Sequence, residues 1–136
     1  MFDNGNPWPL FLAQEPAIQK PSHHRERVLI YEIRVYEAAE GKAEAMRRRF
    51  LDVVAAKFFP RHGIELIGAF TGQTEDGRLT YMTRFADEDA RKKAWAAFGA
   101  DQEWVAAKTA SETGGPLLKS QAISVLSPAT ASLLLS

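Results

Sequence analysis

The sequence predicts an α+β fold in which two helices cover one face of a four-stranded antiparallel sheet. Three observations support this prediction. Four short segments are rich in β-branched and aromatic residues, and two longer segments repeat apolar residues at helical spacing. Gly, Pro and Asp-Gly turn signals separate these segments. The predicted order is β-α-β-β-α-β, which is the ferredoxin-like arrangement.

The first half of the domain starts with a predicted strand at residues 28–36. Residues 42–59 are predicted as the first helix, and Pro60 is expected to end it. The three consecutive arginines at 47–49 fan around this helix, so we interpret them as a solvated flank. The apolar stripe that predicts the helix comprises Met46, Phe50, Val53, Val54 and Phe58.

The second half contains a hairpin, a helical region and a last strand. Asp76-Gly77 predicts the hairpin turn. Asp87 predicts a helix N-cap, and a second helical stretch begins at Asp101 and carries Trp104 inward. The predicted strands are residues 64–71, 79–85 and 119–126. The first predicted helix of this half follows the N-cap Asp87 and ends at Phe98, and the second covers residues 101–112.

The chain divides into an arm at residues 1–27, a domain at residues 28–127 and a tail at residues 128–136. Four prolines block regular structure in the arm, yet its apolar residues are unusual for a simple tail. Either the arm docks on its own domain or a partner subunit, or it is a floppy extension. The adjacent His23 and His24 do not predict a metal site, because metals need more ligands in a suitable geometry.

The composition excludes several classes of function. Seventeen basic and seventeen acidic residues cancel, so we expect no nucleic-acid partner and no anionic membrane surface as partner. There are no cysteines, which excludes disulfides and thiolate chemistry. We find no apolar run of the roughly 20 residues that a membrane span requires and no signal-peptide pattern at the start. A cytoplasmic protein is therefore expected.

Two helices leave the second face of the sheet without cover. By alternation, we expect Glu32, Arg34 and Tyr36 on this open face, with the apolar row of Tyr31, Ile33 and Val35 toward the helices. Residues 80, 82 and 84 join the open face. In the second strand either residues 67, 69 and 71 or residues 66, 68 and 70 join it. Such a mixed face predicts that two sheets pair face to face in a homodimeric, eight-stranded barrel.

Four motifs resemble those of a known family. They are YEIRVY at 31–36, FPRHGIELIGAFTG at 59–72, RFADEDARKKAWAAF at 84–98 and DQEW at 101–104. Their order and spacing over residues 28–127 resemble the NIPSNAP family of the dimeric α/β-barrel superfamily. The resemblance implies a ferredoxin-like protomer and a homodimer. It implies no settled reaction, because the superfamily includes cofactor-free monooxygenases, lactone isomerases, polyketide cyclases and haem enzymes.

The candidate catalytic residues are Glu32, Arg34 and Tyr36, which follow one another on one face of the first strand. A carboxylate can act as a base, an Arg can hold an anionic oxygen, and a Tyr can donate a proton. An alternative is that Glu32 and Arg34 form a structural ion pair, or that Arg84 is the cross-strand partner of Glu32.

The candidate substrate-binding residues are Arg84, Met82 and Trp104. Arg84 would suit an anionic ligand, and Trp104 would line the mouth of a pocket. We interpret His62 as structural, because it follows a helix C-terminus and lacks further ligands at metal spacing. We expect no metal and no cofactor.

The leading hypothesis is a homodimer whose barrel holds a small organic molecule, with cofactor-independent acid/base chemistry of the isomerase, cyclase or monooxygenase kind. Two alternatives stay open: a non-catalytic binding or scaffold module that uses the arm, and a haem- or oxygen-handling enzyme that uses His62.

Overall fold

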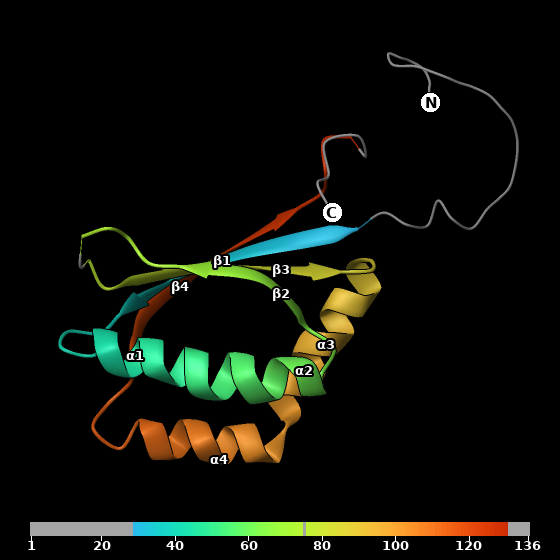
Figure 1. Ribbon diagram of the computed structural model, residues 1–136. Helices are drawn as coiled ribbons and strands as arrows, with labels where there is room; N and C mark the ends of the chain where they lie inside the picture. Colours follow the sequence, from blue (N-terminus) through green and yellow to red (C-terminus); the bar gives the residue numbers. More distant parts are fainter. Residues whose placement is uncertain (1–28, 75, 131–136) are drawn as a thin grey trace, which may run out of the picture.

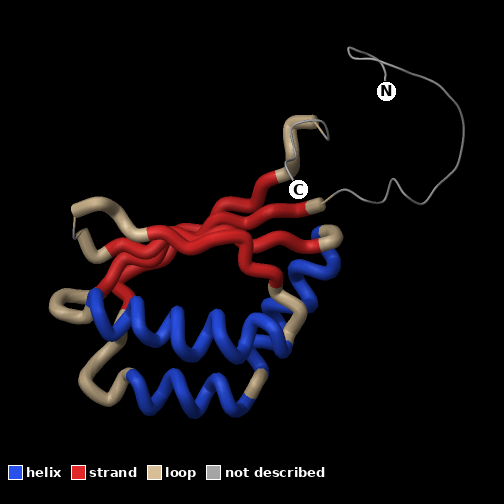
Figure 2. The backbone as a smooth tube through the Cα atoms, in the orientation of Figure 1, coloured by secondary structure: helices blue, strands red, loops and turns tan. Residues whose placement is uncertain are grey.

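The computed structural model describes residues 29–74 and 76–130, so the predicted arm at 1–27, with His23 and His24, lies outside the described residues. Figures 1 and 2 show a sheet with all the helices on one side of it. The strands are β1 (Ile30–Ala38), β2 (Glu65–Phe70), β3 (Arg78–Phe85) and β4 (Leu118–Leu126). The helices are α1 (Ala43–Arg49), η2 (Phe50–Phe58), α2 (Phe59–Arg61), α3 (Glu88–Ala100) and α4 (Gln102–Ser111).

The sheet has the strand order β2-β3-β1-β4, and every neighbouring pair is antiparallel. This order and the helices on one face confirm the predicted ferredoxin-like fold class. Among the described residues, no helix has the length and apolar character to cross a membrane.

The first helix contains an unusual central segment. α1, η2 and α2 follow one another without a break, and η2 is a π-helix of nine residues. The helix continues through Pro60 to Arg61, so the prediction that Pro60 ends it was wrong by one residue. Pro60 lies in the first turn of α2, directly after η2, where the N–H of Phe59 bonds the carbonyl of Val54 five residues earlier. Gly63, at φ +69°, closes the helix in the left-handed conformation.

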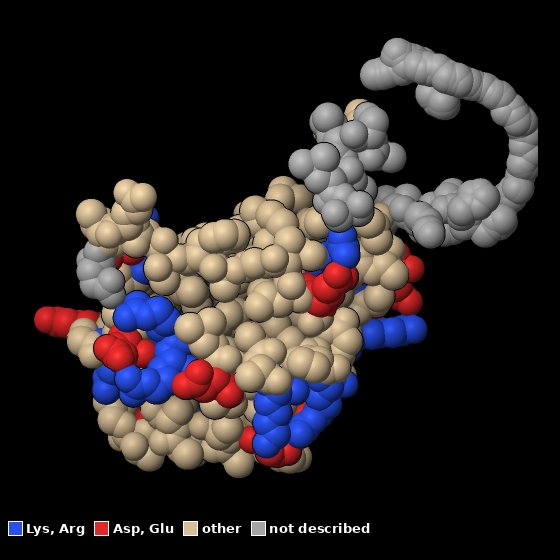
Figure 3. Space-filling model, in the orientation of Figure 1, with Lys and Arg blue, Asp and Glu red and all other residues tan. Residues whose placement is uncertain are grey.

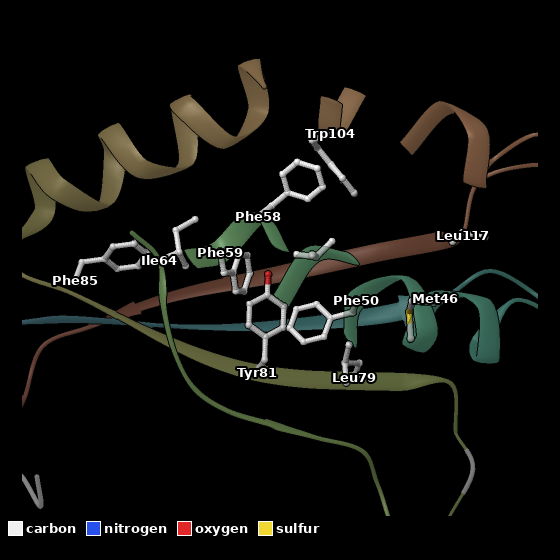
Figure 4. Close-up of a cluster of buried hydrophobic side chains, with 11 residues drawn as sticks. Met46, Phe50, Phe58, Phe59, Ile64, Leu79, Tyr81, Phe85, Trp104 and Leu117 are labelled. Atoms are coloured by element: carbon white, nitrogen blue, oxygen red, sulfur yellow. The ribbon is translucent and has the colours of Figure 1, made fainter. Parts of the chain in front are cut away.

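The core lies between the helices and β3. Phe50 and Phe59 project onto Tyr81 of β3 from the long helix that α1, η2 and α2 form, as Figure 4 shows. Phe58 of the same helix packs instead against Phe98 and Trp104. The rings of Phe50 and Tyr81 have centroids 4.5 Å apart, and those of Phe59 and Tyr81 are 5.9 Å apart. Aromatic packing of this kind adds to the hydrophobic stabilisation of a core.

The face assigned to Glu32, Arg34 and Tyr36 was wrong. Glu32 pairs with Thr83 and Arg34 pairs with Tyr81, and paired residues of antiparallel strands share a face. Glu32 and Thr83 are both fully buried, so this is the face that the helices cover. Strand alternation predicts which residues share a face, but it does not predict which face the helices cover.

The apolar row of β1 therefore occupies the open face. Tyr31, Ile33 and Val35 pair with Arg84, Met82 and Thr80 of β3. The open-face position predicted for residues 80, 82 and 84 is thus correct, but they lie on the opposite side of the sheet from Glu32.

The phase of β2 changes along the strand. The register shifts between Leu66 and Gly68, which leaves Ile67 as an extra residue. Leu66 pairs with Thr83 on the helix face, whereas Gly68 and Phe70 pair with residues of the open face. Neither regular alternation that the sequence allowed extends over the whole strand.

Ionic contacts attach α4 to the long helix. Asp101 is the N-cap of α4, and its carboxylate Oδ2 accepts from Arg61 at 2.9 Å and from the ring of His62 at 2.8 Å. Lys57 pairs with Glu103 in the first turn of α4. The contact with Asp101 agrees with the structural interpretation of His62.

The pH dependence of stability tests this attachment. Hydrogen bonds from His62 and then Arg61 hold the pKa of Asp101 below its ordinary value of 3.8. A lowered carboxylate pKa adds stability above the unfolded pKa and loses it as the pH falls. Asp101→Asn keeps a capping side chain but removes the charge. We expect its free energy of unfolding to fall less steeply than that of the wild type between about pH 5 and about pH 2, measured by urea unfolding. Asp89→Asn, which changes an exposed carboxylate, is the control and should follow wild type.

Candidate functional site

A cavity of about 280 Å³ lies between the helix face of the sheet and the helices. Three cationic side chains line it, together with two uncharged polar groups, and no acidic residue is in its lining. The rest of the wall is apolar and largely aromatic. The cations are Arg34, Arg49 and Lys108, the polar groups are Tyr36 and Gln121, and the wall includes Met46, Phe50, Val54, Trp95, Phe98, Gly99, Trp104 and Leu118.

A buried carboxylate stands behind this cavity. Glu32 is fully buried, and its Oε1 accepts a hydrogen bond from the indole Nε1 of Trp95 at 2.7 Å. Its Oε2 accepts from Arg91 Nη1 at 2.9 Å and from Arg34 Nη2 at 3.2 Å. A buried carboxylate is tolerated when it is paired and hydrogen-bonded, and three donors meet that condition here.

Arg34 is held in one orientation by three different contacts. Besides Glu32, its Nη1 donates to Gln121 Oε1 at 3.1 Å. The indole ring of Trp95 lies against the guanidinium, whose carbon is 3.8 Å from the ring centroid. The Nε–H of Arg34 is buried and has no hydrogen-bond partner among the described residues. Arg34 therefore lines the cavity with a fixed guanidinium, one nitrogen of which is buried and lacks an acceptor among the described residues.

Tyr36 lies two residues further along the same strand face. Its hydroxyl is 2.8 Å from the hydroxyl of Tyr81. Burial raises the pKa of Tyr36 above its ordinary value of 10.0, and burial likewise raises the pKa of Tyr81. Both phenols are therefore protonated at neutral pH, so neither Tyr36 nor Tyr81 is a base.

The two other cations of the lining share one carboxylate. Arg49 Nη1 donates to Glu112 at 2.8 Å, and Lys108 Nζ donates to the same carboxylate at 3.1 Å. Two positive charges and one negative charge thus meet among Arg49, Lys108 and Glu112, which leaves one positive charge uncompensated. The Arg49 side chain is only 9% exposed, whereas that of Arg48 is 66% exposed. The prediction of a solvated arginine flank is therefore wrong for Arg49.

The structure brings some of the predicted site residues together and separates others. Arg34, Tyr36 and Trp104 line the same cavity, and Glu32 lies directly behind Arg34. Met82 and Arg84 lie on the open face, outside the cavity. Arg84 binds Glu65, with Nε at 3.0 Å from its carboxylate, so the alternative of Arg84 as partner of Glu32 is wrong.

Four lining or supporting residues were missed as site residues: Trp95, Gln121, Arg49 and Lys108. Trp95 lies three residues before Phe98 in the sequence, and aromatic residues at helical spacing are typical of a core or cavity wall, which is a usable signal. Gln121 lies in an edge strand and gave no signal, because its role depends on the pairing of β4 with β1.

A second hollow of about 560 Å³ lies between β3 and α3, and its charged groups are already partnered. Arg84 binds Glu65 there, and Arg61 and His62 bind Asp101. Among the described residues there is also no cluster of three or more His, Cys, Asp or Glu side chains that could hold a metal ion. The cavity at Arg34 is the candidate site because its lining holds three cations and no acid, and one of them, Arg34, has a nitrogen without an acceptor among the described residues.

Fold and cavity together define a ferredoxin-like α+β domain with a cationic and aromatic cleft beneath its sheet. The NIPSNAP family model matches residues 31–133, and the chain belongs to this family. No curated protein matches the chain.

Solved structures of NIPSNAP family proteins are similar to this chain, among them the following three. An uncharacterized NIPSNAP-like domain protein from Burkholderia xenovorans is 22% identical, with a TM-score of 0.67 over 81% of this chain and 93% of that chain. A NIPSNAP family protein with unknown function from Agrobacterium tumefaciens is 24% identical, with a TM-score of 0.66 over 83% and 97%. Another family protein from Agrobacterium tumefaciens is 25% identical, with a TM-score of 0.66 over 79% and 99%. These likenesses support the fold.

Replacing the buried carboxylate tests its structural role. Glu32→Gln keeps the size of the side chain but leaves Arg34 and Arg91 without their shared negative charge. We expect a loss of about 3–5 kcal/mol in the free energy of unfolding, as when one partner of a buried ion pair is removed. Urea unfolding followed by circular dichroism measures this loss. Glu40→Gln, in an exposed turn, is the control. A loss below about 0.5 kcal/mol for Glu32→Gln, the range of an ordinary surface substitution, would contradict the role.

Proposed function

We propose that this NIPSNAP chain binds a small organic anion with a flat apolar body in the cavity beneath its sheet. The observation that carries the proposal is the buried Nε–H of Arg34, which has no acceptor among the described residues. Leaving a buried donor unpaired is costly, and Arg34 lines the cavity, so an anionic oxygen of a ligand beside its guanidinium would offset part of that cost.

Charge and shape support the same class of ligand. The lining holds three cations and no acid, which favours an anion electrostatically. Trp95, Phe98 and Trp104 offer ring surfaces, and the rings of Phe98 and Trp104 are stacked with centroids 5.0 Å apart. An apolar cavity with a few convergent polar groups is typical of small-molecule sites.

The groups of the cavity restrict the chemistry that the proposal includes. Glu32 is not in the lining, and its two oxygens already accept three hydrogen bonds. We therefore assign Glu32 to positioning Arg34, in place of the base role that the strand pattern suggested. Tyr36 is a neutral donor and Arg34 a fixed cation. These two groups suit stabilisation of, or proton donation to, an anionic oxygen.

Binding of 2-naphthoate tests the proposal by isothermal titration calorimetry. Wild type should bind 2-naphthoate and should not bind the cation 2-naphthylmethylammonium. Arg34→Gln should lower the affinity about 10- to 100-fold, which corresponds to loss of a hydrogen bond to a charged group. Arg84→Gln, on the open face, is the matched control and should bind as wild type. Equal affinity of wild type and Arg34→Gln, or equal binding of the anion and the cation, would reject the proposal.

We also propose that a second copy of the chain covers the open face of the sheet. The middle of this face is apolar or uncharged, with Ile33, Val35 and Met82 facing away from the helices. Charged pairs lie toward its ends, Arg84 with Glu65 and Arg78 opposite Glu37. In Figure 3 charged side chains likewise gather around the helices and toward the ends of the sheet. An apolar centre with a polar rim is the usual anatomy of a protein interface, and self-pairing of one face gives a two-fold dimer.

Native mass spectrometry tests the dimer. Wild type should have the mass of two chains, and Ile33→Glu should give a folded monomer, because it places a charge in the centre of the proposed interface. Leu51→Glu adds the same charge at an exposed apolar residue of η2 and should stay dimeric. A strictly monomeric wild type at micromolar concentration would overturn the proposal.

A further inference from the structure

The hydroxyls of two tyrosines meet beside the cavity. Only one of these two residues belongs to its lining. Tyr36 lines the cavity, whereas Tyr81 is fully buried and does not. The two oxygens are 2.8 Å apart, so one hydroxyl donates to the other. Distance alone does not say which of the two is the donor, and the direction decides what Tyr36 presents to a ligand.

The surroundings of Tyr81 decide the direction. Its ring lies against the rings of Phe50 and Phe59, and Figure 4 shows its hydroxyl pointing into this aromatic core. Among the described residues, the hydroxyl of Tyr36 is its one hydrogen-bond partner. A phenol carries one hydrogen to donate. If Tyr36 donated, the hydrogen of Tyr81 would be buried among apolar groups without an acceptor, which is costly.

The opposite direction leaves no buried hydrogen unpaired. If Tyr81 donates to Tyr36, the hydrogen of Tyr36 is free, and Tyr36 lies where solvent or a ligand can accept it. Its charged neighbours on the cavity side are Arg34 and Arg49, which are donors and cannot accept. Gln121 pairs with Tyr36 across β1 and β4, and its acceptor oxygen takes a hydrogen bond from Arg34. Within the described chain the hydroxyl of Tyr36 therefore bonds to Tyr81, and its free hydrogen is available to a ligand.

We infer that Tyr81 is a positioning residue that fixes Tyr36 as a donor to an anionic oxygen of the ligand, in the cavity that the guanidinium of Arg34 also lines. This inference rests on the proposed anion-binding function. Arg34 and Tyr36 are two residues apart on one strand, so they project from the same face. Two prearranged donors select a ligand with a carboxylate, enolate or phenolate oxygen at the end of its flat body.

The direction of the hydrogen bond can be measured without any ligand. The chain has three tyrosines, Tyr31, Tyr36 and Tyr81, so carbon-13 labelling of the tyrosine ring carbon that bears the hydroxyl gives three signals. Tyr36→Phe and Tyr81→Phe assign two of them. We expect the hydroxyl hydrogen of Tyr81 to exchange slowly with solvent and that of Tyr36 to exchange fast. Slow exchange at both Tyr36 and Tyr81 would overturn the inference.

The role in binding is measured with 2-naphthoate and with naphthalene, which has the same rings and no acceptor. Tyr36→Phe should lower the affinity for 2-naphthoate about tenfold and leave that for naphthalene unchanged. Tyr81→Phe should also weaken 2-naphthoate, by a smaller factor, because Tyr36 then donates without a fixed orientation. Tyr31→Phe, on the open face, is the control. If Tyr36 were the donor to Tyr81, both substitutions would leave the affinity unchanged or raise it.

The two measurements separate the inference from the function on which it rests. Failure of wild type to bind 2-naphthoate would reject the proposed anion site, while hydroxyl exchange would still decide the direction of the hydrogen bond. A loss of affinity shared equally by 2-naphthoate and naphthalene would show that the tyrosine pair only supports packing, and would overturn the positioning role.

Discussion

The candidate site depends on the buried carboxylate of Glu32. A single unpaired carboxylate in this position would cost several kcal/mol, so its donors must be in place whenever the domain is folded. Those donors come from β1 and α3, and they are Arg34, Arg91 and Trp95. Because the same carboxylate fixes Arg34, the requirement to satisfy a buried charge also fixes the geometry of the cavity wall.

The sheet separates two regions that the sequence pattern had combined. Arg34, Tyr36 and Trp104 belong to a cleft on the helix side, whereas Met82 and Arg84 belong to the open face. In our account the two faces have different roles: the helix side holds the ligand, and the apolar open face pairs with a second copy. A site on the helix side is complete within one chain, so ligand binding and pairing can be tested separately.

The element order could be predicted from the sequence because its signals are local. Capping by Asp87 and Asp101, the turn at Gly63 and the apolar stripe of the long helix are each defined within a few residues. The face that carries the site could not be predicted in this way. Glu32 is buried because Arg91 and Trp95 reach it from 59 and 63 residues away. No pattern within β1 contains that information.

Arg49 shows the same limit within a helix. Three consecutive arginines give no indication of which one turns inward, and Arg49 does so because Glu112, far along the chain, accepts from it. Conversely, Arg34 and Tyr36 were found as candidates because two polar groups at spacing i, i+2 share one face of a strand whatever lies beyond it. Sequence patterns thus found the members of the site that lie on one element, and missed those that depend on contacts between elements.

Nuclear magnetic resonance mapping of 2-naphthoate on the full chain reports which side of the sheet the ligand occupies. If the ligand binds beneath the sheet, we expect chemical-shift changes at Arg34, Trp95 and Gln121, including the side-chain signals of Trp95, with Ile33 and Met82 unchanged. Changes centred on Ile33, Met82 and Arg84, with Trp95 unaffected, would contradict binding beneath the sheet and return the site to the open face.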